Sequence, residues 1–244
     1  MKTVGRQGIA MYRERQVVDM KKGNVIGDNS IDTVYITAEK TPDSPFWVNI
    51  MIVVQDGRTN QYTQIPLKQN QGYNPTLFLG DFTGDRVEDI MVVMDTGGSG
   101  GMLNAYVFAY RGSQFRPLFD SDVFNDLFKY RVFYLDYYKA QVNSYTTNQK
   151  FIIDLTTRGR QYLSEIYYPN GKLKKPIQGF VSGLSGLYPV DFDRNGTCEL
   201  LAYQNIAGQY NADRLGYVQT TMKWNGQVFA PEVQNVVVFG GDIS

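Results

Sequence analysis

An acidic stretch and the apolar run directly after it decide the fold of this chain: Gly80-Asp81-Phe82-Thr83-Gly84-Asp85-Arg86-Val87-Glu88-Asp89-Ile90, then Met91-Val92-Val93-Met94. Counted from Asp81, oxygen-bearing side chains stand at positions 1, 3, 5 and 9. This spacing favours a tightly curled loop whose oxygens converge on one hard cation. Ca²⁺ is such a cation, because it accepts about six to eight oxygen ligands in irregular geometry. The run after the loop is typical of a strand, not of a helix.

The same spacing returns further along the chain in Asp191-Phe192-Asp193-Arg194-Asn195-Gly196-Thr197-Cys198-Glu199-Leu200. Asp191 lies 110 residues after Asp81, or twice 55. A step of about this size back from Asp81 reaches Asn24, Asp28 and Asp32, which stand at positions 1, 5 and 9 of another loop. One step forward reaches Asp136, where the strand and the first Asp persist and the acidic loop does not. The chain therefore contains four repeat units.

The repeat predicts an all-β fold. Each unit is expected to hold four antiparallel strands, and four-stranded sheets repeated radially form a β-propeller. A unit of this size cannot bury both faces alone, so neighbouring blades must stack. We expect a single β-propeller domain over 1–244, with four blades, or five if the two termini share one. The expected units are approximately 15–72, 73–128, 129–183 and 184–244.

Apolar periodicity and turn residues place the expected elements. Short helical insertions are expected at 121–130 and 160–168, and Asn225-Gly226 gives the clearest hairpin signal. The expected strands are 15–20, 32–38, 47–54, 62–67, 76–82, 89–94, 104–110, 115–119, 130–137, 150–155, 186–192, 198–204, 215–224 and 233–239.

Composition excludes several classes of function. The 244 residues carry 24 basic and 24 acidic side chains, and a net charge of zero disfavours nucleic-acid binding. The absence of histidine removes Ser-His-Asp and Cys-His catalysis and His-ligated zinc or iron. A single cysteine, Cys198, cannot form an intrachain disulfide. Lys172, Lys174 and Lys175 form a small cluster that is typical of a solvated strand edge.

At the acidic loops the sequence resembles the FG-GAP and VCBS repeat family, the blades of the integrin α-subunit head. The family's motif is roughly Asp-Phe-Asn-Gly-Asp-Gly-x-x-Asp followed by a short apolar strand, and Asp81–Asp89 and Asp191–Glu199 follow it best. The resemblance implies a propeller that binds Ca²⁺ between the first two strands of a blade. Arg86 departs from the motif, because it stands where a glycine normally adopts positive φ, at a cost of roughly 1–2 kcal/mol.

This interpretation predicts a set of calcium ligands in each loop. The competing interpretation is a solvated acidic turn in which Arg86 supplies the counter-charge. The first loop loses a ligand because Ile26 stands at position 3, and the unit at Asp136 is expected to be empty. The predicted ligands are Asp81, Thr83, Asp85, Asp89 and the Val87 carbonyl; then Asp191, Asp193, Asn195, Glu199 and the Thr197 carbonyl; and, as a weaker set, Asn24, Asp28, Ser30 and Asp32.

Two functions remain open. The first is a non-enzymatic propeller that binds a protein or a glycan, with Ca²⁺ stabilising the blade loops. The alternative is a carbohydrate-active lyase or hydrolase on the same scaffold, which would need a non-repeated cluster of Asp, Glu, Tyr or Arg. Tyr134, Tyr137, Tyr138, Tyr167 and Tyr168 could form a stacking platform for sugars, or could belong to the core.

The sequence also bears on localisation. No stretch reaches the length of a membrane span, and the start of the chain lacks the apolar segment of a signal peptide. We therefore expect synthesis in the cytoplasm, with later assembly into a surface or spore layer as one way to meet extracellular Ca²⁺.

Overall fold

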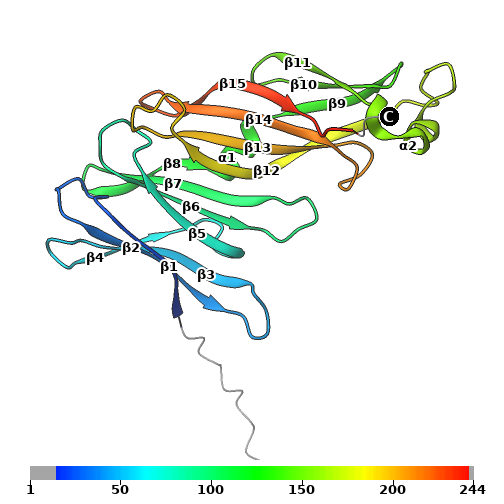
Figure 1. Cartoon of the computed structure of the whole chain (residues 1–244). Coiled ribbons are helices and arrows are strands. Elements are labelled where there is room, and N and C mark those ends of the chain that lie inside the picture. Colours follow the sequence, from blue (N-terminus) through cyan, green and yellow to red (C-terminus); the bar gives the residue numbers. More distant parts are fainter. Residues whose placement is uncertain (1–14, 242–244) are drawn as a thin grey trace, which may run out of the picture.

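Strands make up most of the computed structural model, which describes residues 15–241 (Figure 1). The ends of the expected domain, 1–14 and 242–244, lie outside the described residues. The first sheet has the order β1 (Arg15–Gly23), β2 (Asp32–Lys40), β3 (Trp47–Gln55), β4 (Tyr62–Pro66). The second has the order β5 (Tyr73–Gly80), β6 (Asp89–Asp95), β7 (Leu103–Arg111), β8 (Gln114–Asp120).

The third sheet has seven strands and is nearly closed into a barrel-like form. Neighbouring strands are antiparallel throughout. Its order is β11 (Gln149–Asp154), β10 (Lys139–Ser144), β9 (Tyr130–Leu135), β12 (Gln178–Val190), β13 (Glu199–Ala207), β14 (Arg214–Trp224), β15 (Phe229–Val237). Helix α1 (Ser121–Leu127) follows β8, and η1 (Thr156–Arg158) and α2 (Arg160–Ile166) follow β11.

Side-chain alternation explains why these segments are strands. In β2 the buried Val34, Ile36 and Ala38 alternate with partly exposed residues, so one face of the strand enters the core. Strand β6 is apolar on both faces: Ile90, Val92 and Met94 pack toward the first sheet, and Met91 packs toward the third. The second sheet therefore lies in the middle of the molecule, covered on both sides.

Most of the expected elements are confirmed. Helices α1 and α2 lie within the two predicted insertions, and Gly226, at φ 96°, turns the predicted hairpin between β14 and β15. Strand β10 was not predicted, and β15 begins at Phe229, four residues before the expected start. The polar residues Lys139, Gln141, Asn143 and Ser144 hid the alternation in β10, where only Ala140 and Val142 supply the apolar face.

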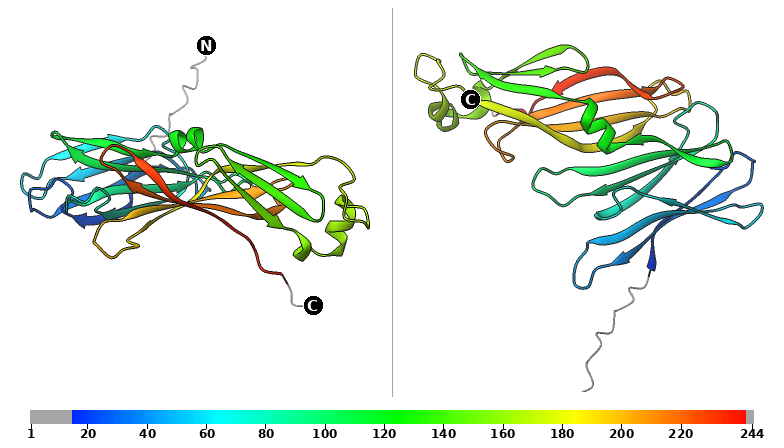
Figure 2. Two further views of the ribbon diagram at one scale, coloured as in Figure 1. Left: turned by 90° about the horizontal axis from the view of Figure 1, so that it is seen from above. Right: turned by 180° about the vertical axis from the view of Figure 1, so that it is seen from behind.

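The all-β class is confirmed, but the sheets form an open stack and not an evident ring of four blades. The first and third sheets lie at opposite ends with the second between them (Figures 1 and 2). The physical reason lies in the third unit. Strand β9 pairs edge to edge with β12, through Gln178 opposite Phe133 and Gly179 opposite Val132. Strands β9–β11 therefore extend the last sheet sideways, and no blade remains to carry the stack round to the first sheet.

Candidate metal centre

Three loops share one backbone conformation: the first loop (Asn24–Asp32), the second loop (Asp81–Asp89) and the fourth loop (Asp191–Glu199). They join β1 to β2, β5 to β6 and β12 to β13, which is the same place in each unit. Positions 4 and 6 have positive φ in all three. The residues concerned are Gly27 and Asn29, Gly84 and Arg86, and Arg194 and Gly196, with φ between 59° and 89°. The repeat in sequence is therefore also a repeat in backbone geometry.

The acidic residue at position 9 has the same role in each loop. It accepts a hydrogen bond from the main-chain N–H at position 2: Val25 to Asp32 at 2.9 Å, Phe82 to Asp89 at 3.0 Å and Phe192 to Glu199 at 3.2 Å. Asp32, Asp89 and Glu199 are all buried. A buried N–H without a partner is costly, so the carboxylate at position 9 closes the loop.

The side chains at positions 1 and 5 also serve the backbone. Asp81 accepts from the N–H groups of Thr83, Gly84 and Arg86. Position 5 accepts from the N–H at position 7, as Asp85 does from Val87 and Asn195 does from Thr197. The regularly spaced acidic side chains thus accept hydrogen bonds from the main chain of their own loop. Because a carboxylate offers about four lone-pair sites, these bonds leave oxygen lone pairs for a cation.

Neighbouring loops are joined in a row. The N–H of Glu88, at position 8 of the second loop, donates to the carbonyl of Asn24, at position 1 of the first, at 3.0 Å. The N–H of Cys198, at position 8 of the fourth loop, donates in the same way to the carbonyl of Asp81 at 2.7 Å. The row therefore runs first, second, fourth, which is the stacking order of the sheets.

In the described part of the chain, Asp81, Asp85 and Asp89 of the second loop are not among the acidic side chains whose oxygens converge within 4.8 Å. Thr83 Oγ1 is buried and has no hydrogen-bond partner. Burial raises the pKa of Asp89 to about 7, and the nearby Asp85 and Asp81 act in the same direction. Among the described residues, no Lys or Arg nitrogen forms an ion pair with a carboxylate of this loop. Arg111 acts on Asp89 only weakly, and its guanidinium lies over the Trp224 ring at 5.2 Å.

The fourth loop brings three predicted ligands together around a lysine. One carboxylate oxygen from each of Asp191, Asp193 and Glu199 falls within a mutual distance of 4.8 Å. Lys223, on β14, places its ammonium 3.0 Å from Glu199 Oε1 and 3.3 Å from Asp193 Oδ2. These carboxylates raise the pKa of Lys223. An ammonium ion thus occupies the position that the sequence predicts for Ca²⁺.

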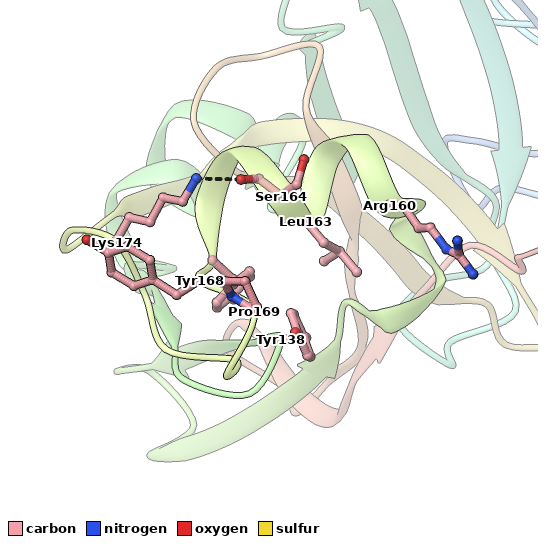
Figure 3. Close-up of a pocket in the computed structure, with 8 residues that line it drawn as sticks. Tyr138, Arg160, Leu163, Ser164, Tyr168, Pro169 and Lys174 are labelled. Atoms are coloured by element: carbon pink, nitrogen blue, oxygen red, sulfur yellow. Dashed lines mark hydrogen bonds between the residues drawn. The ribbon is translucent and has the colours of Figure 1, made fainter.

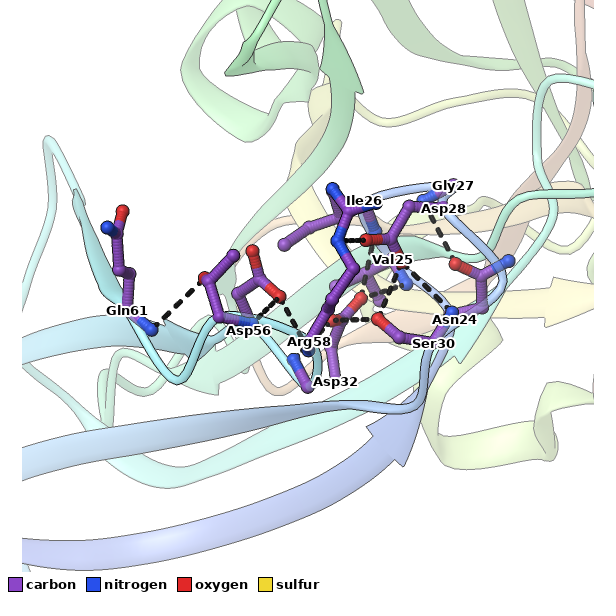
Figure 4. Close-up of polar contacts among 12 residues, drawn as sticks. Asn24, Val25, Ile26, Gly27, Asp28, Ser30, Asp32, Asp56, Arg58 and Gln61 are labelled. Atoms are coloured by element: carbon purple, nitrogen blue, oxygen red, sulfur yellow. Dashed lines mark hydrogen bonds and ion pairs between the residues drawn. The ribbon is translucent and has the colours of Figure 1, made fainter.

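The first loop is neutralised by Arg58, which lies in the turn between β3 and β4 (Figure 4). Arg58 Nε lies 3.1 Å from Asp28 Oδ2, and Ser30 bonds to Asp28 Oδ1 through its N–H and its hydroxyl. The Ser30 hydrogen bonds and the Arg58 charge lower the pKa of Asp28. Asp32 accepts from three main-chain donors, the N–H groups of Val25, Ile26 and Gly57.

The unit at Asp136 has no acidic loop. Tyr137 and Tyr138 both adopt positive φ and turn the chain directly from β9 into β10. Asp136 accepts from the N–H of Leu173 at 2.9 Å. A turn of three residues, 136–138, leaves no room for a nine-residue loop.

Two further features escaped the sequence. One is a buried cluster in which the Tyr134 and Tyr162 hydroxyls and Arg158 Nη2 lie 3.1, 3.0 and 2.7 Å from carboxylate oxygens of Asp213. Burial raises the pKa of both tyrosines, that of Tyr162 to about 12, so neither hydroxyl is activated as a nucleophile. The cluster ties α2 to β14 and gives no specific support to an enzyme. Its members are far apart in the sequence, and no spacing signals them.

The other feature is a cleft of about 540 Å³ beside α2 (Figure 3). Tyr138, Leu163, Tyr167 and Tyr168 supply apolar lining, and Arg160 and Lys174 supply positive charge. Lys174 Nζ bonds to the Ser164 carbonyl at 2.6 Å and lies over the Tyr168 ring at 6.0 Å. The predicted tyrosine platform is thus divided: Tyr134 and Tyr167 are buried, whereas Tyr137 and Tyr168 are exposed.

Comparison with known proteins gives two matches. The family described as the YybI C-terminal domain matches residues 128–237, which contain the whole seven-stranded sheet. The protein YybI of Bacillus subtilis (strain 168), whose name assigns no activity, is 58% identical over 230 residues, covering 94% of this chain and 88% of that protein. No solved structure matches the chain. None of the described helices is long and apolar enough to span a membrane.

The resemblance to FG-GAP and VCBS repeats is therefore wrong, since the matching family is a different one. The loops explain why the motif misled. Oxygens at positions 1, 5 and 9 are needed to bind the N–H groups of a loop with two left-handed residues. That local requirement accounts for the spacing in this chain without a shared family.

Proposed function

The chain belongs to the YybI family, and from that premise we propose that it is a non-enzymatic interaction module whose acidic loops are stabilised by Ca²⁺. Membership of this family assigns no activity, so the proposal rests on the loops. Its ligand is a protein or a glycan, and the cleft beside α2 offers the surface such a role needs. The aromatic lining and the charges of Arg160 and Lys174 favour a ligand that carries acidic groups.

One contrast among equivalent loops carries the calcium proposal. Arg58 neutralises the first loop and Lys223 neutralises the fourth. The second loop holds Asp81, Asp85 and Asp89 without an ion pair among the described residues, and it also holds the unpartnered Thr83 hydroxyl. Like charges in one site repel unless a cation compensates them. Ca²⁺ supplies in the second loop what the side-chain cations supply in the other two.

The fourth loop is the second candidate. Its three carboxylates already converge, so a Ca²⁺ ion could displace the Lys223 ammonium, whose side chain is 44% exposed and free to swing into solvent. The two loops differ in their affinity for a cation. The second loop takes Ca²⁺ without competition, and the fourth must first release its lysine.

Thermal unfolding in excess Ca²⁺ and in excess chelator tests the proposal. Saturation at about 100 times Kd adds about 2.7 kcal/mol per site. Asp85→Ala should remove most of this stabilisation. Thr83→Val should raise stability in chelator, because it removes a buried unpartnered hydroxyl worth about 1–3 kcal/mol, and should reduce the calcium response.

Ser30→Ala is the matched control, because Arg58 already neutralises the first loop. This variant should retain the full calcium response. Equal unfolding temperatures of the unsubstituted chain in Ca²⁺ and in chelator would contradict the proposal. A response that survives both Asp85→Ala and Thr83→Val would move the site out of the second loop.

A further inference from the structure

The seven-stranded sheet ends in two edge strands that face each other. Thr147, beside β11, donates its hydroxyl to Gln234 of β15 at 2.9 Å, and the chain after β15 passes beside Thr157. Between these contacts lies a groove of about 650 Å³ lined by residues of both edges, including Phe151, Ile153, Val236, Val238 and Phe239. We call this groove the seam.

Strand direction prevents the seam from closing in the pattern of the rest of the sheet. All six neighbouring pairs in the order β11-β10-β9-β12-β13-β14-β15 are antiparallel. Strands β11 and β15 therefore run in the same direction. One additional strand, antiparallel to both, would complete an all-antiparallel barrel, which has an even number of strands.

The seam carries apolar side chains on both faces of the sheet, beside the polar Lys150, Asp154 and Thr157. Phe151 and Val236 belong to the inner face and are only partly buried, although both pack against the core of the barrel. Ile152, Val237 and Phe239 remain exposed at 51%, 40% and 47%. An extended segment in the seam would cover both sets and pair with two rows of main-chain groups, so it must itself be apolar on both faces.

We propose that the seam binds the segment Gly8–Tyr12 of a second copy of this chain as an eighth strand. The sequence Ile9-Ala10-Met11-Tyr12 is apolar at consecutive positions and therefore on both faces of an extended strand. It lies in the 14 residues that precede β1, and β11 itself is only six residues long. Strand β1 lies at the end of the stack opposite the seam (Figure 1), so the donor is another copy.

The proposal fixes the kind of assembly. The donor segment and the seam are different parts of the chain, so the contact is heterologous and repeats head to tail. Sedimentation equilibrium of the full chain over a concentration series should show masses rising through multiples of 27.7 kDa. Excess synthetic peptide of residues 1–14 should occupy the seams and return the mass to one chain. A scrambled peptide should not.

Variants on the two sides of the contact make the experiment specific. Met11→Asp in the donor segment and Val238→Lys in the seam should each make the protein monomeric at every concentration. Only Val238→Lys should abolish binding of the peptide. Val123→Lys is the control, because Val123 is equally exposed, at 54%, on α1. Circular dichroism checks that all three variants fold. A full chain that stays monomeric overturns the proposal, as does an assembly that persists in both Met11→Asp and Val238→Lys.

Discussion

Single residues set the conformation of the acidic loops. Positions 4 and 6 need positive φ, yet the chain fills them with Gly, Asn or Arg. Position 4 is glycine in the first two loops and arginine in the fourth, whereas position 6 is glycine only in the fourth. Each loop therefore keeps at least one glycine and tolerates one strained residue. The strain at Arg86, expected from its place in the sequence, is confirmed by its φ of 66°.

Arg86→Gly should stabilise the protein by about 0.5–1 kcal/mol. Relief of a left-handed non-glycine residue gains about 1–2 kcal/mol, and the greater freedom of glycine in the unfolded chain offsets part of it. Gly196→Ala at the same position of the fourth loop should destabilise by about 1 kcal/mol. No atom lies within 4 Å of the added Cβ, so only the backbone resists it. Urea midpoints at constant m-value give both numbers, and a loss of stability in Arg86→Gly would mean that the arginine makes a compensating contact.

At the same scale, the sequence predicted a set of oxygens in each loop but not the side-chain cations beside them. Among the described residues, three predicted carboxylates converge in the fourth loop. Asp81, Asp85 and Asp89 are close in sequence, so local geometry decides their positions. Arg58 lies 30 residues after its partner Asp28, and Lys223 lies 24 residues after its partner Glu199. Such ion pairs depend on how the strands are aligned in the sheets, so they cannot be predicted from the spacing of residues in the sequence.

Between elements, the row of loops connects the three stacked sheets. Main-chain bonds join the second loop to the first through Glu88 and Asn24, and to the fourth through Asp81 and Cys198. The second loop is therefore the central member of the row. A cation bound in the second loop would hold rigid the loop to which both neighbouring loops are hydrogen-bonded. Its effect on the free energy of unfolding should therefore extend beyond one sheet.

Lys223→Met should make the stability of the fourth loop depend on calcium. Met keeps apolar bulk but removes the ammonium, and Glu199, which is 2% exposed, loses its counter-charge. We expect a loss of about 1–3 kcal/mol in chelator, because a buried charge without a partner is costly and the exposure of Lys223 softens the effect. Excess Ca²⁺ should restore most of it. Chemical denaturation in both conditions measures the difference.

Lys68→Met is the matched control for that experiment. Lys68 pairs with Asp122 at 2.6 Å, but their side chains are 61% and 33% exposed. Loss of a surface pair costs about 0–1 kcal/mol. The control should show no recovery in Ca²⁺. Equal behaviour of the two variants would argue against a cation site in the fourth loop.

At the scale of the whole molecule, strands were easier to predict than their assembly. Alternation and turn residues such as Asn225-Gly226 are local signals, and they placed most strands within a few residues. The ring was inferred from equal spacing, which cannot tell face-to-face stacking from edge-to-edge pairing. Gly179, where an added Cβ would lie 2.3 Å from the Ala207 carbonyl oxygen, pairs with Val132 and brings β12 beside β9.

An open stack should unfold from its free end. The second sheet is covered on both faces, by cores that include Val92 on one side and Val107 on the other, whereas the first sheet is covered on one. Because an end unit has only one neighbouring interface, its local opening costs less free energy. Hydrogen exchange followed by mass spectrometry should therefore show faster exchange in β2 and β3 than in β6 and β7.

The variant Glu88→Ala tests the contact between the first and second loops. It removes the carboxylate that accepts the N–H of Asn24 at 2.8 Å, and it should speed exchange in β1 and β2 while leaving exchange in β13 and β14 unchanged. Equal exchange in all three sheets would mean that the molecule opens as one cooperative unit, as a closed ring would.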